Sequence, residues 1–138
     1  MPVDRRTLEA SDELLKNVDE DTLILAGLKA LSNKCHRQEI DAGWFDGLPR
    51  NPGEQCALIH SEVSEALEGF RKGCMDDHLP NRRMAEVEFA DVMIRIAGYG
   101  GGELGFDLGG ATLEKLAYNR NRADHKLENR NAEGGKKF

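Results

Sequence analysis

The spacing of apolar residues along the chain predicts helices rather than strands. From Val18 to Ile40 apolar side chains recur on one helix face, and the acidic residues at the start of this stretch suit a helix N-terminus. Runs of β-branched residues, which favour strands, are absent. We therefore predict an all-α fold, an antiparallel bundle of four to five helices. The expected helices span about residues 7–18, 18–40, 53–73, 81–97 and 107–122.

Glycine and proline mark the breaks between these helices. The stretch "DAGWFDGLPRNPG" contains two prolines and three glycines, which predicts a loop. "GYGGG" is expected to end the helix before it, and "GGGELG" to form a flexible turn; its GxGxxG spacing follows a helix instead of a strand, so it does not indicate a dinucleotide site. The predicted organisation is an N-terminal extension (1–20), one helical domain (21–125) and a flexible tail (126–138).

Composition and charge narrow the classes of protein. A length of 138 residues suits about one domain. The net charge of −6 argues against a broad nucleic-acid surface, which needs clustered Lys and Arg. We find neither the apolar run of a signal peptide nor a stretch of membrane-spanning length, so we expect a cytoplasmic protein without nucleic-acid or membrane partners. Cys35, Cys56 and Cys74 form no CxxC pair, which indicates neither a disulfide framework nor a zinc site.

Two pairs of acidic residues lie in the two middle helices. Glu62 and Glu65 are three residues apart in "IHSEVSEALEGFRKG". Glu88 and Asp91 have the same spacing in a helix that is otherwise mostly apolar. Carboxylates in such surroundings repel one another by roughly 4 kcal/mol per close pair at intermediate dielectric. Positive charge is therefore expected beside them.

Salt bridges or a metal ion can supply that charge. For a single Glu-x-x-Glu pair, a solvated face with salt bridges is the commoner outcome. A divalent metal is the alternative, because Mg²⁺ and Mn²⁺ take oxygen ligands and carboxylates one turn apart converge on one ion. The short connection between the two helices predicts a hairpin that faces both acid pairs across one seam, which favours the metal. The candidate salt-bridge partners are Arg71, Lys72, Arg82, Arg83 and Arg95.

The ordered acid pairs resemble the signature of a known family, the MazG-like all-α nucleoside triphosphate pyrophosphohydrolases. Their ExxE motif, followed after a spacer by ExxD, matches Glu62-x-x-Glu65 and Glu88-x-x-Asp91. "GWFD" before the first pair and "LEKLAYNRNRADHK" after the second are also similar to members of this family. The resemblance covers about residues 22–126 and leaves out the N-terminal residues and the glycine-rich segment.

The resemblance implies hydrolysis of (deoxy)nucleoside triphosphates to nucleoside monophosphate and pyrophosphate, with Mg²⁺ or Mn²⁺ as cofactor, in housekeeping of the nucleotide pool. Glu62 or Glu65 would orient or deprotonate the attacking water. The implied metal ligands are Glu62, Glu65, Glu88 and Asp91.

The resemblance also suggests residues that contact the nucleotide. Lys115, Asn119 and Arg122 recur near one face of the last helix, where similar positions in the family contact the substrate; a solvated helix face is the alternative. Arg95 can reach a phosphate or neutralise Asp91, and the second role is the safer expectation.

Trp44 is the only tryptophan of the chain and lies in the loop that is expected to cover the base. Stacking on the base and packing as a core plug are equally compatible with its position. Phe45 and His36 are weaker candidates for the same pocket.

Two other functions stay open at this stage. One is a reaction like that of phosphoribosyl-ATP pyrophosphatase, and the other is a non-catalytic helical module that binds a nucleotide or a metal. A complete set of four acids favours an enzyme, because carboxylates repel a triphosphate unless metal ions intervene. Apolar surface on the short helices, together with the family's habit, predicts a homodimer or a homotetramer.

Overall fold

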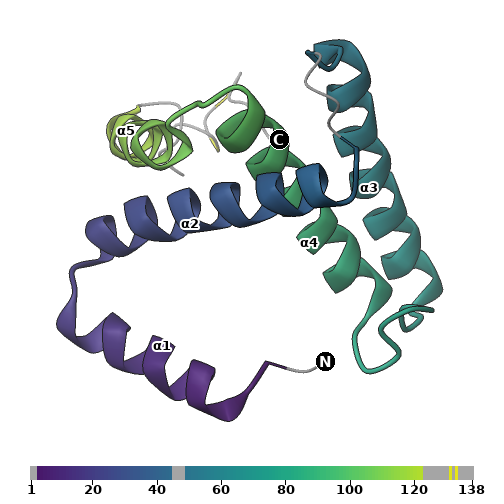
Figure 1. Cartoon of the computed structure of the whole chain (residues 1–138), viewed down its shortest axis with the longest axis horizontal. Helices are drawn as coiled ribbons and strands as arrows, with labels where there is room; N and C mark the ends of the chain where they lie inside the picture. The colour runs from purple at the N-terminus through teal and green to yellow at the C-terminus, as the bar shows by residue number, and fades with distance from the viewer. Residues whose placement is uncertain (1–2, 45–48, 123–130, 132, 134–138) are drawn as a thin grey trace. The chain divides into compact units, whose positions relative to one another are not determined.

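A computed structural model describes residues 3–44 and 49–122 together with Asn131 and Glu133 (Figure 1). Over these residues the chain contains five α-helices and one π-helical segment and no β-strand, which confirms the predicted all-α fold. Contacts group the chain into two compact units, residues 27–106 and residues 1–26 with 107–138. The helices are α1 (Arg5–Asn17), α2 (Glu20–Asp41), α3 (Pro52–Lys72), α4 (Met84–Arg95) and α5 (Leu108–Asn121), with the π-helical segment η1 (Ile96–Glu103) after α4.

The unit formed by the two ends of the chain contains α1, the start of α2, and α5. Asp4 caps α1 by accepting a hydrogen bond from the Arg6 N–H, yet no residue of α1 is buried. Asp107 caps α5 in the same way, which starts the helix despite the two glycines in its first turn. A Cβ atom at Gly109 would lie 3.1 Å from Leu25, so glycine allows this close approach. The predicted tail, apart from Asn131 and Glu133, lies outside the described residues.

Helix α3 begins and ends where local sequence signals place it. Asn51 caps it by accepting hydrogen bonds from the N–H groups of Gly53 and Glu54, and Pro52 occupies the first turn. Gly73 ends the helix with a left-handed φ of 63°. The prediction of a helix over about residues 53–73 is thus confirmed within two residues.

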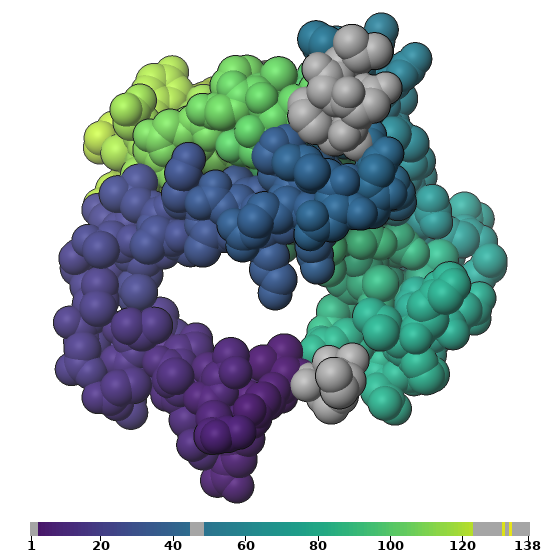
Figure 2. Space-filling view, in the orientation of Figure 1, coloured from purple at the N-terminus to yellow at the C-terminus, as the bar shows by residue number. Residues whose placement is uncertain are grey.

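Helices α3 and α4 form the predicted hairpin, and in Figure 2 their side chains and the loop between them make one continuous surface. The crossing is tight because its residues are small: Ala66 is fully buried, and a Cβ atom at Gly69 would lie 2.8 Å from the Ala85 backbone nitrogen. Helix α4 begins at Met84 instead of about Asn81, because residues 80–82 form a turn and Arg83, paired with Met75 in an antiparallel β-bridge, has an extended backbone.

Two expectations for the glycine-rich segment are wrong. "GYGGG" does not end the helix, since residues 96–103 continue it as the wider π-helix η1. The Leu104 N–H donates to the Tyr99 carbonyl, five residues back, at 2.9 Å. The turn predicted over "GGGELG" is confined to its end, at Gly105, whose φ is 66°, because residues 100–103 are helical. The glycines let η1 approach α2 closely: Cβ atoms at Gly98 and Gly102 would overlap with Glu39 and His36.

Candidate functional site

The α3–α4 hairpin brings three of the four predicted acids together. Glu62 and Glu65 come from α3 and Glu88 from α4, and each offers an oxygen within 4.8 Å of the other two. Glu62 and Glu88 are buried, with exposed fractions of 7% and 8%, while Glu65 is exposed. The antiparallel pairing therefore produces a compact acidic group, open to solvent on the Glu65 side.

Asp91 lies one turn beyond Glu88 on α4 and is not part of this three-residue group. It is half-buried, and burial, followed by the negative charge of Glu62, raises the pKa of its carboxyl, although Arg95 opposes the shift. Asp91 therefore belongs to the same electrostatic neighbourhood but stands at its edge.

Arg95 supplies positive charge to the acids from α4 itself. Its Nε donates to Glu62 Oε1 at 2.7 Å, so the ion pair is with Glu62, whereas the sequence favoured Asp91 as its partner. The other candidate cations with ion pairs lie elsewhere: Arg71 and Lys72 pair with Glu68, and Arg82 pairs with Glu86. Within the described part of the chain, salt bridges thus compensate one acid of the four.

Glu88 shows the electrostatic consequence. Burial, the charge of Glu65 and a hydrogen bond with Glu62 raise the pKa of the Glu88 carboxyl from 4.5 to about 7. Near neutral pH the metal-free site therefore binds a proton that an exposed glutamate would have lost. A cation that enters the site must compete with this proton.

The donor set fits a divalent metal of the hard class. Carboxylate oxygens from neighbouring helix turns are the ligands that Mg²⁺ and Mn²⁺ prefer, and three of them converge here with little built-in compensation. Glu62, Glu65 and Glu88 would hold such an ion, with Asp91 as the fourth candidate.

A cavity of about 390 Å³ is lined by one of the four acids, Asp91. Arg95, the partner of Glu62, and Trp44 line it as well. Trp44 is 71% exposed, which does not fit the core-plug interpretation and leaves its indole face accessible to a ligand. The remaining lining residues are Cys35, Gln38, Glu39, Ala42, Arg50, Gln55 and Ile94.

The predicted substrate residues of the last helix lie in the other unit. The Lys115 Nζ lies 4.6 Å from the centre of the Tyr118 ring, and the Arg122 guanidinium lies 5.6 Å from it. Lys115 and Asn119 line a second cavity of about 340 Å³ together with other residues of α5. Asn119 Oδ1 is buried there and accepts no hydrogen bond within the described residues.

The weaker candidates have different outcomes. His36 packs on Gly102, and its Nδ1 lies 3.8 Å from the Glu39 carboxylate, but it does not line the larger cavity. Phe45 lies outside the described residues.

Asp76 and Arg50 are residues of the site that the sequence did not indicate. Asp76, in the α3–α4 loop, is buried; its carboxylate accepts hydrogen bonds from the His78 and Leu79 N–H groups, and its charge contributes to the raised pKa of Asp91. The pattern "DDHLP" is typical of such a turn and could have drawn attention to it. Arg50 has no local signal, because its partners are distant in the sequence.

Comparisons of the chain with protein families, characterised proteins and solved structures find no match. Among the described helices none is long and apolar enough to cross a membrane.

Proposed function

We propose that the chain is a divalent-metal-dependent hydrolase that converts a nucleoside triphosphate and water into a nucleoside monophosphate and pyrophosphate. The observation that carries this proposal is the group of Glu62, Glu65 and Glu88, whose neighbours Asp91 and Arg95 line a cavity with an exposed tryptophan. The order and spacing of the acid pairs, which resemble the MazG-like pyrophosphohydrolases, support the same reaction.

The three acids have unequal environments, which suggests unequal roles. Glu62 on α3 and Glu88 on α4 are buried, so they suit the role of metal ligands. Glu65 is exposed and suits the orientation or deprotonation of the water that attacks the α-phosphorus. A bound divalent ion would supply positive charge to the phosphate oxygens and increase the acidity of water.

The cavity is the proposed place of the nucleoside. Trp44 offers a flat apolar face on which any base can stack, and this contact would set affinity more than base identity. Arg95 lines the cavity while it is bound to Glu62. When a cation takes over the charge of Glu62, Arg95 is free to donate to a phosphate oxygen.

We also propose a homodimer or homotetramer, in which further helices complete an antiparallel bundle. Apolar residues one turn apart form a stripe on each helix of the hairpin, and their exposed fractions lie between 40% and 62%. Exposed apolar surface of this extent is typical of interfaces. Light scattering at micromolar concentration should report an assembly, and a fully active monomer would contradict it. The stripe consists of Val63, Leu67, Phe70, Phe89, Met93 and Ile96.

The proposed reaction has a direct test. A panel of nucleoside triphosphates is incubated with the protein and Mg²⁺ or Mn²⁺, and phosphate is measured with and without added inorganic pyrophosphatase. Signal that requires the added pyrophosphatase indicates release of pyrophosphate, whereas signal without it indicates removal of a terminal phosphate. Glu88→Gln should lower the activity by roughly 10–100-fold, and Glu86→Gln on the exposed side of α4 should keep it. Activity that persists in excess EDTA would contradict metal dependence, and metal or nucleotide binding without turnover would favour a non-catalytic module.

A further inference from the structure

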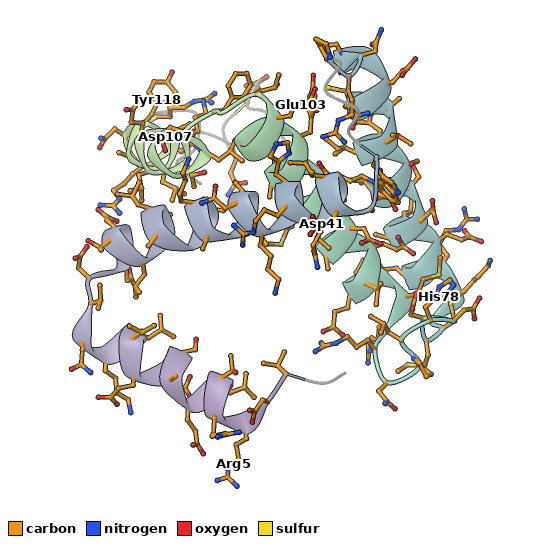
Figure 3. The ribbon with its side chains drawn as sticks, in the orientation of Figure 1. Arg5, Asp41, His78, Glu103, Asp107 and Tyr118 are labelled. Carbon is orange, nitrogen blue, oxygen red and sulfur yellow. The ribbon has the colours of Figure 1, made fainter. Side chains whose placement is uncertain are left out.

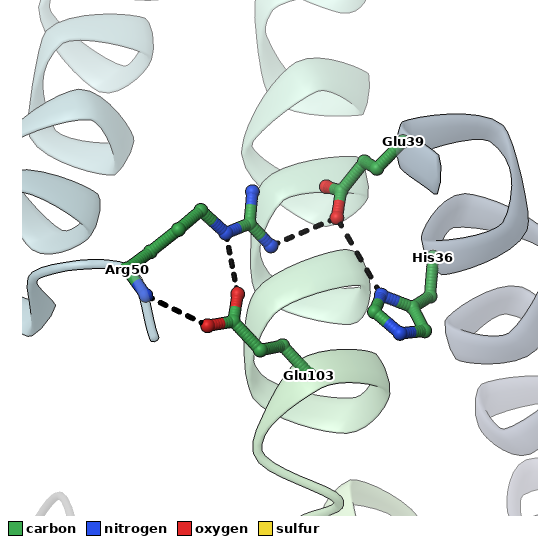
Figure 4. Close-up of polar contacts among 4 residues, drawn as sticks. All are labelled: His36, Glu39, Arg50 and Glu103. Atoms are coloured by element: carbon green, nitrogen blue, oxygen red, sulfur yellow. Dashed lines mark hydrogen bonds and ion pairs between the residues drawn. The ribbon is translucent and has the colours of Figure 1, made fainter. Parts of the chain in front are cut away.

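A second, largely buried charge cluster contains Arg50, Glu39 and Glu103 (Figure 4), and two of its members, Arg50 and Glu39, line the same cavity. Arg50 donates from its backbone N–H to Glu103 Oε1 at 2.9 Å and from its Nε to Glu103 Oε2. Its Nη2 donates to Glu39 Oε2 at 2.8 Å. The guanidinium carbon also lies 5.4 Å from the centre of the Tyr99 ring. One arginine thus joins three segments: the end of α2, the start of α3 and η1.

Two residues of this cluster, Glu39 and Arg50, are linked to parts of the proposed substrate site. The Glu39 carbonyl accepts a hydrogen bond from the Trp44 N–H at 3.0 Å, so Glu39 is linked directly to the residue proposed to stack on the base. Arg50 precedes Asn51, the cap of α3, the helix that carries Glu62 and Glu65. The cluster therefore connects the cavity wall at Trp44 to the helix that carries the acids.

The π-helical segment explains how Glu103 reaches this position. Glu103 is the last residue of η1 (Figure 3), and the π-helix follows α4 without a break. Gly98 lies against the Glu39 carboxylate, where a Cβ atom would overlap with it. Glycine at this position and the wide helical turn thus allow both carboxylates to approach Arg50.

The charges of the cluster favour a fixed geometry. The side chains of Arg50, Glu39 and Glu103 are exposed by 17%, 13% and 7%. Burial disfavours the charged form of Glu103, but the hydrogen bonds from Arg50 outweigh it and lower the pKa of this carboxyl. A planar guanidinium that meets two carboxylates in fixed directions restricts orientation more than a lysine could.

We propose that Glu39 and Glu103 are positioning residues for the cavity, which act through Arg50 to fix Trp44 and the start of α3 relative to each other. The identity of the ligand rests on the proposed function, whereas the effect on Trp44 itself does not. Neither residue is assigned a contact with the reacting atoms.

The test uses Trp44 as the only tryptophan of the full-length chain. Glu103→Gln replaces one carboxylate oxygen by an NH2 group, which cannot accept a hydrogen bond from Arg50. We expect the fast, sub-nanosecond component of the Trp44 anisotropy decay to grow about twofold without any ligand, while the helix content measured by circular dichroism is unchanged. Gly98→Ala should act in the same direction by displacing the Glu39 carboxylate. The control is Gly27→Ala, because a Cβ atom there meets nothing within 4 Å.

Kinetics separates positioning from a merely structural role. For accepted nucleotides Glu103→Gln should raise KM roughly three- to tenfold and change kcat less than about twofold, because the acids are untouched. Arg50→Lys should show the same rise in KM, since an ammonium cannot reproduce the bidentate contact of the guanidinium. An unchanged Trp44 anisotropy in both Glu103→Gln and Gly98→Ala would overturn the proposal, whether or not the wild-type protein hydrolyses nucleotides. A roughly three- to tenfold fall in kcat with an unchanged KM would overturn the proposal as well.

Discussion

The two buried charge clusters of the residue 27–106 unit differ in how their carboxylates are compensated. Around Arg50, two glutamates share one guanidinium, and the pKa of Glu103 is lowered. In the α3–α4 seam, Arg95 pairs with Glu62 and acts on Asp91, and the pKa of Glu88 is raised to about 7. The chain thus provides its own cation in the first cluster and leaves the second short of positive charge. This contrast is the physical basis for proposing a structural role for the first cluster and metal binding for the second.

Removal of the arginine from each cluster should change the free energy of unfolding most, and by unequal amounts in the two clusters. Arg50→Met removes the guanidinium from two buried carboxylates, although Glu103 keeps the backbone N–H of residue 50 and Glu39 keeps His36 at 3.8 Å, and it should lower the free energy of unfolding by about 3 kcal/mol. Arg95→Met should cost less, because its side chain is 31% exposed and a divalent ion can replace its charge. Urea denaturation with and without Mn²⁺ measures both. Equal losses, unaffected by Mn²⁺, would abolish the distinction between the clusters.

Loss of a carboxylate from the seam should mainly reduce activity. Glu62→Gln and Glu88→Gln should each lower kcat/KM by roughly 10–100-fold, because a metal ligand is lost. Asp91→Asn, at the edge of the group, should cost about tenfold. The assay is pyrophosphate release, with Glu68→Gln as the matched control on α3, since Glu68 pairs with surface cations. A larger loss in Asp91→Asn than in Glu88→Gln would contradict the geometry.

Trp44 lines the cavity together with residues of both clusters and should affect affinity alone. Trp44→Ala should raise KM for every accepted nucleotide by several-fold to tens-fold, or about 1–3 kcal/mol of stacking. Thermal stability and Mn²⁺ affinity should stay the same, because the side chain is mostly exposed and is not a ligand. An unchanged KM with a lowered melting temperature would identify Trp44 as a packing residue.

The pH dependence of stability should have opposite signs in the two clusters. The raised pKa of Glu88 means that the folded, metal-free protein holds this proton more tightly than the unfolded chain, so stability falls as pH rises from about 4.5 through about 7. The lowered pKa of Glu103 instead stabilises the fold above the unfolded value, and this contribution is lost as pH falls toward and below 4.5. At pH 8, Glu88→Gln should therefore be more stable than the wild-type protein by about 1 kcal/mol without metal. Urea titrations at pH 5 and pH 8 would show it, and a variant that is less stable at both values would refute the assignment.

Helices and the acid seam were predictable because their signals are local. Capping residues, proline and glycine mark the ends of α3, and an i, i+3 spacing on two helices joined by a short loop is enough to face Glu62 toward Glu88. The periodicity also predicts which residues share a face, but not whether that face is covered. Val63 and Phe70 follow the apolar spacing of one α3 face and are nevertheless exposed in the single chain.

The Arg50 cluster could not be predicted for the opposite reason. Arg50 and Glu103 are separated by 53 residues, and no spacing rule links them. The local sequence around the glycines of η1 predicts the end of a helix, whereas in the structure these glycines let one helix approach another closely. Only the tertiary packing of Gly98 against Glu39 distinguishes a glycine that ends a helix from one that permits contact.

The most direct test of the contrast is calorimetric titration of the metal-free protein with Mn²⁺ at pH 6.5, in two buffers of different ionisation enthalpy. Because the pKa of Glu88 is about 7, binding should release roughly three quarters of a proton from this residue for the first ion. In Glu88→Gln the affinity should fall about tenfold or more and the proton release should disappear, while Glu86→Gln should behave like the wild-type protein. Absence of binding at millimolar Mn²⁺, or unchanged affinity and proton release in Glu88→Gln, would contradict a metal site in the α3–α4 seam.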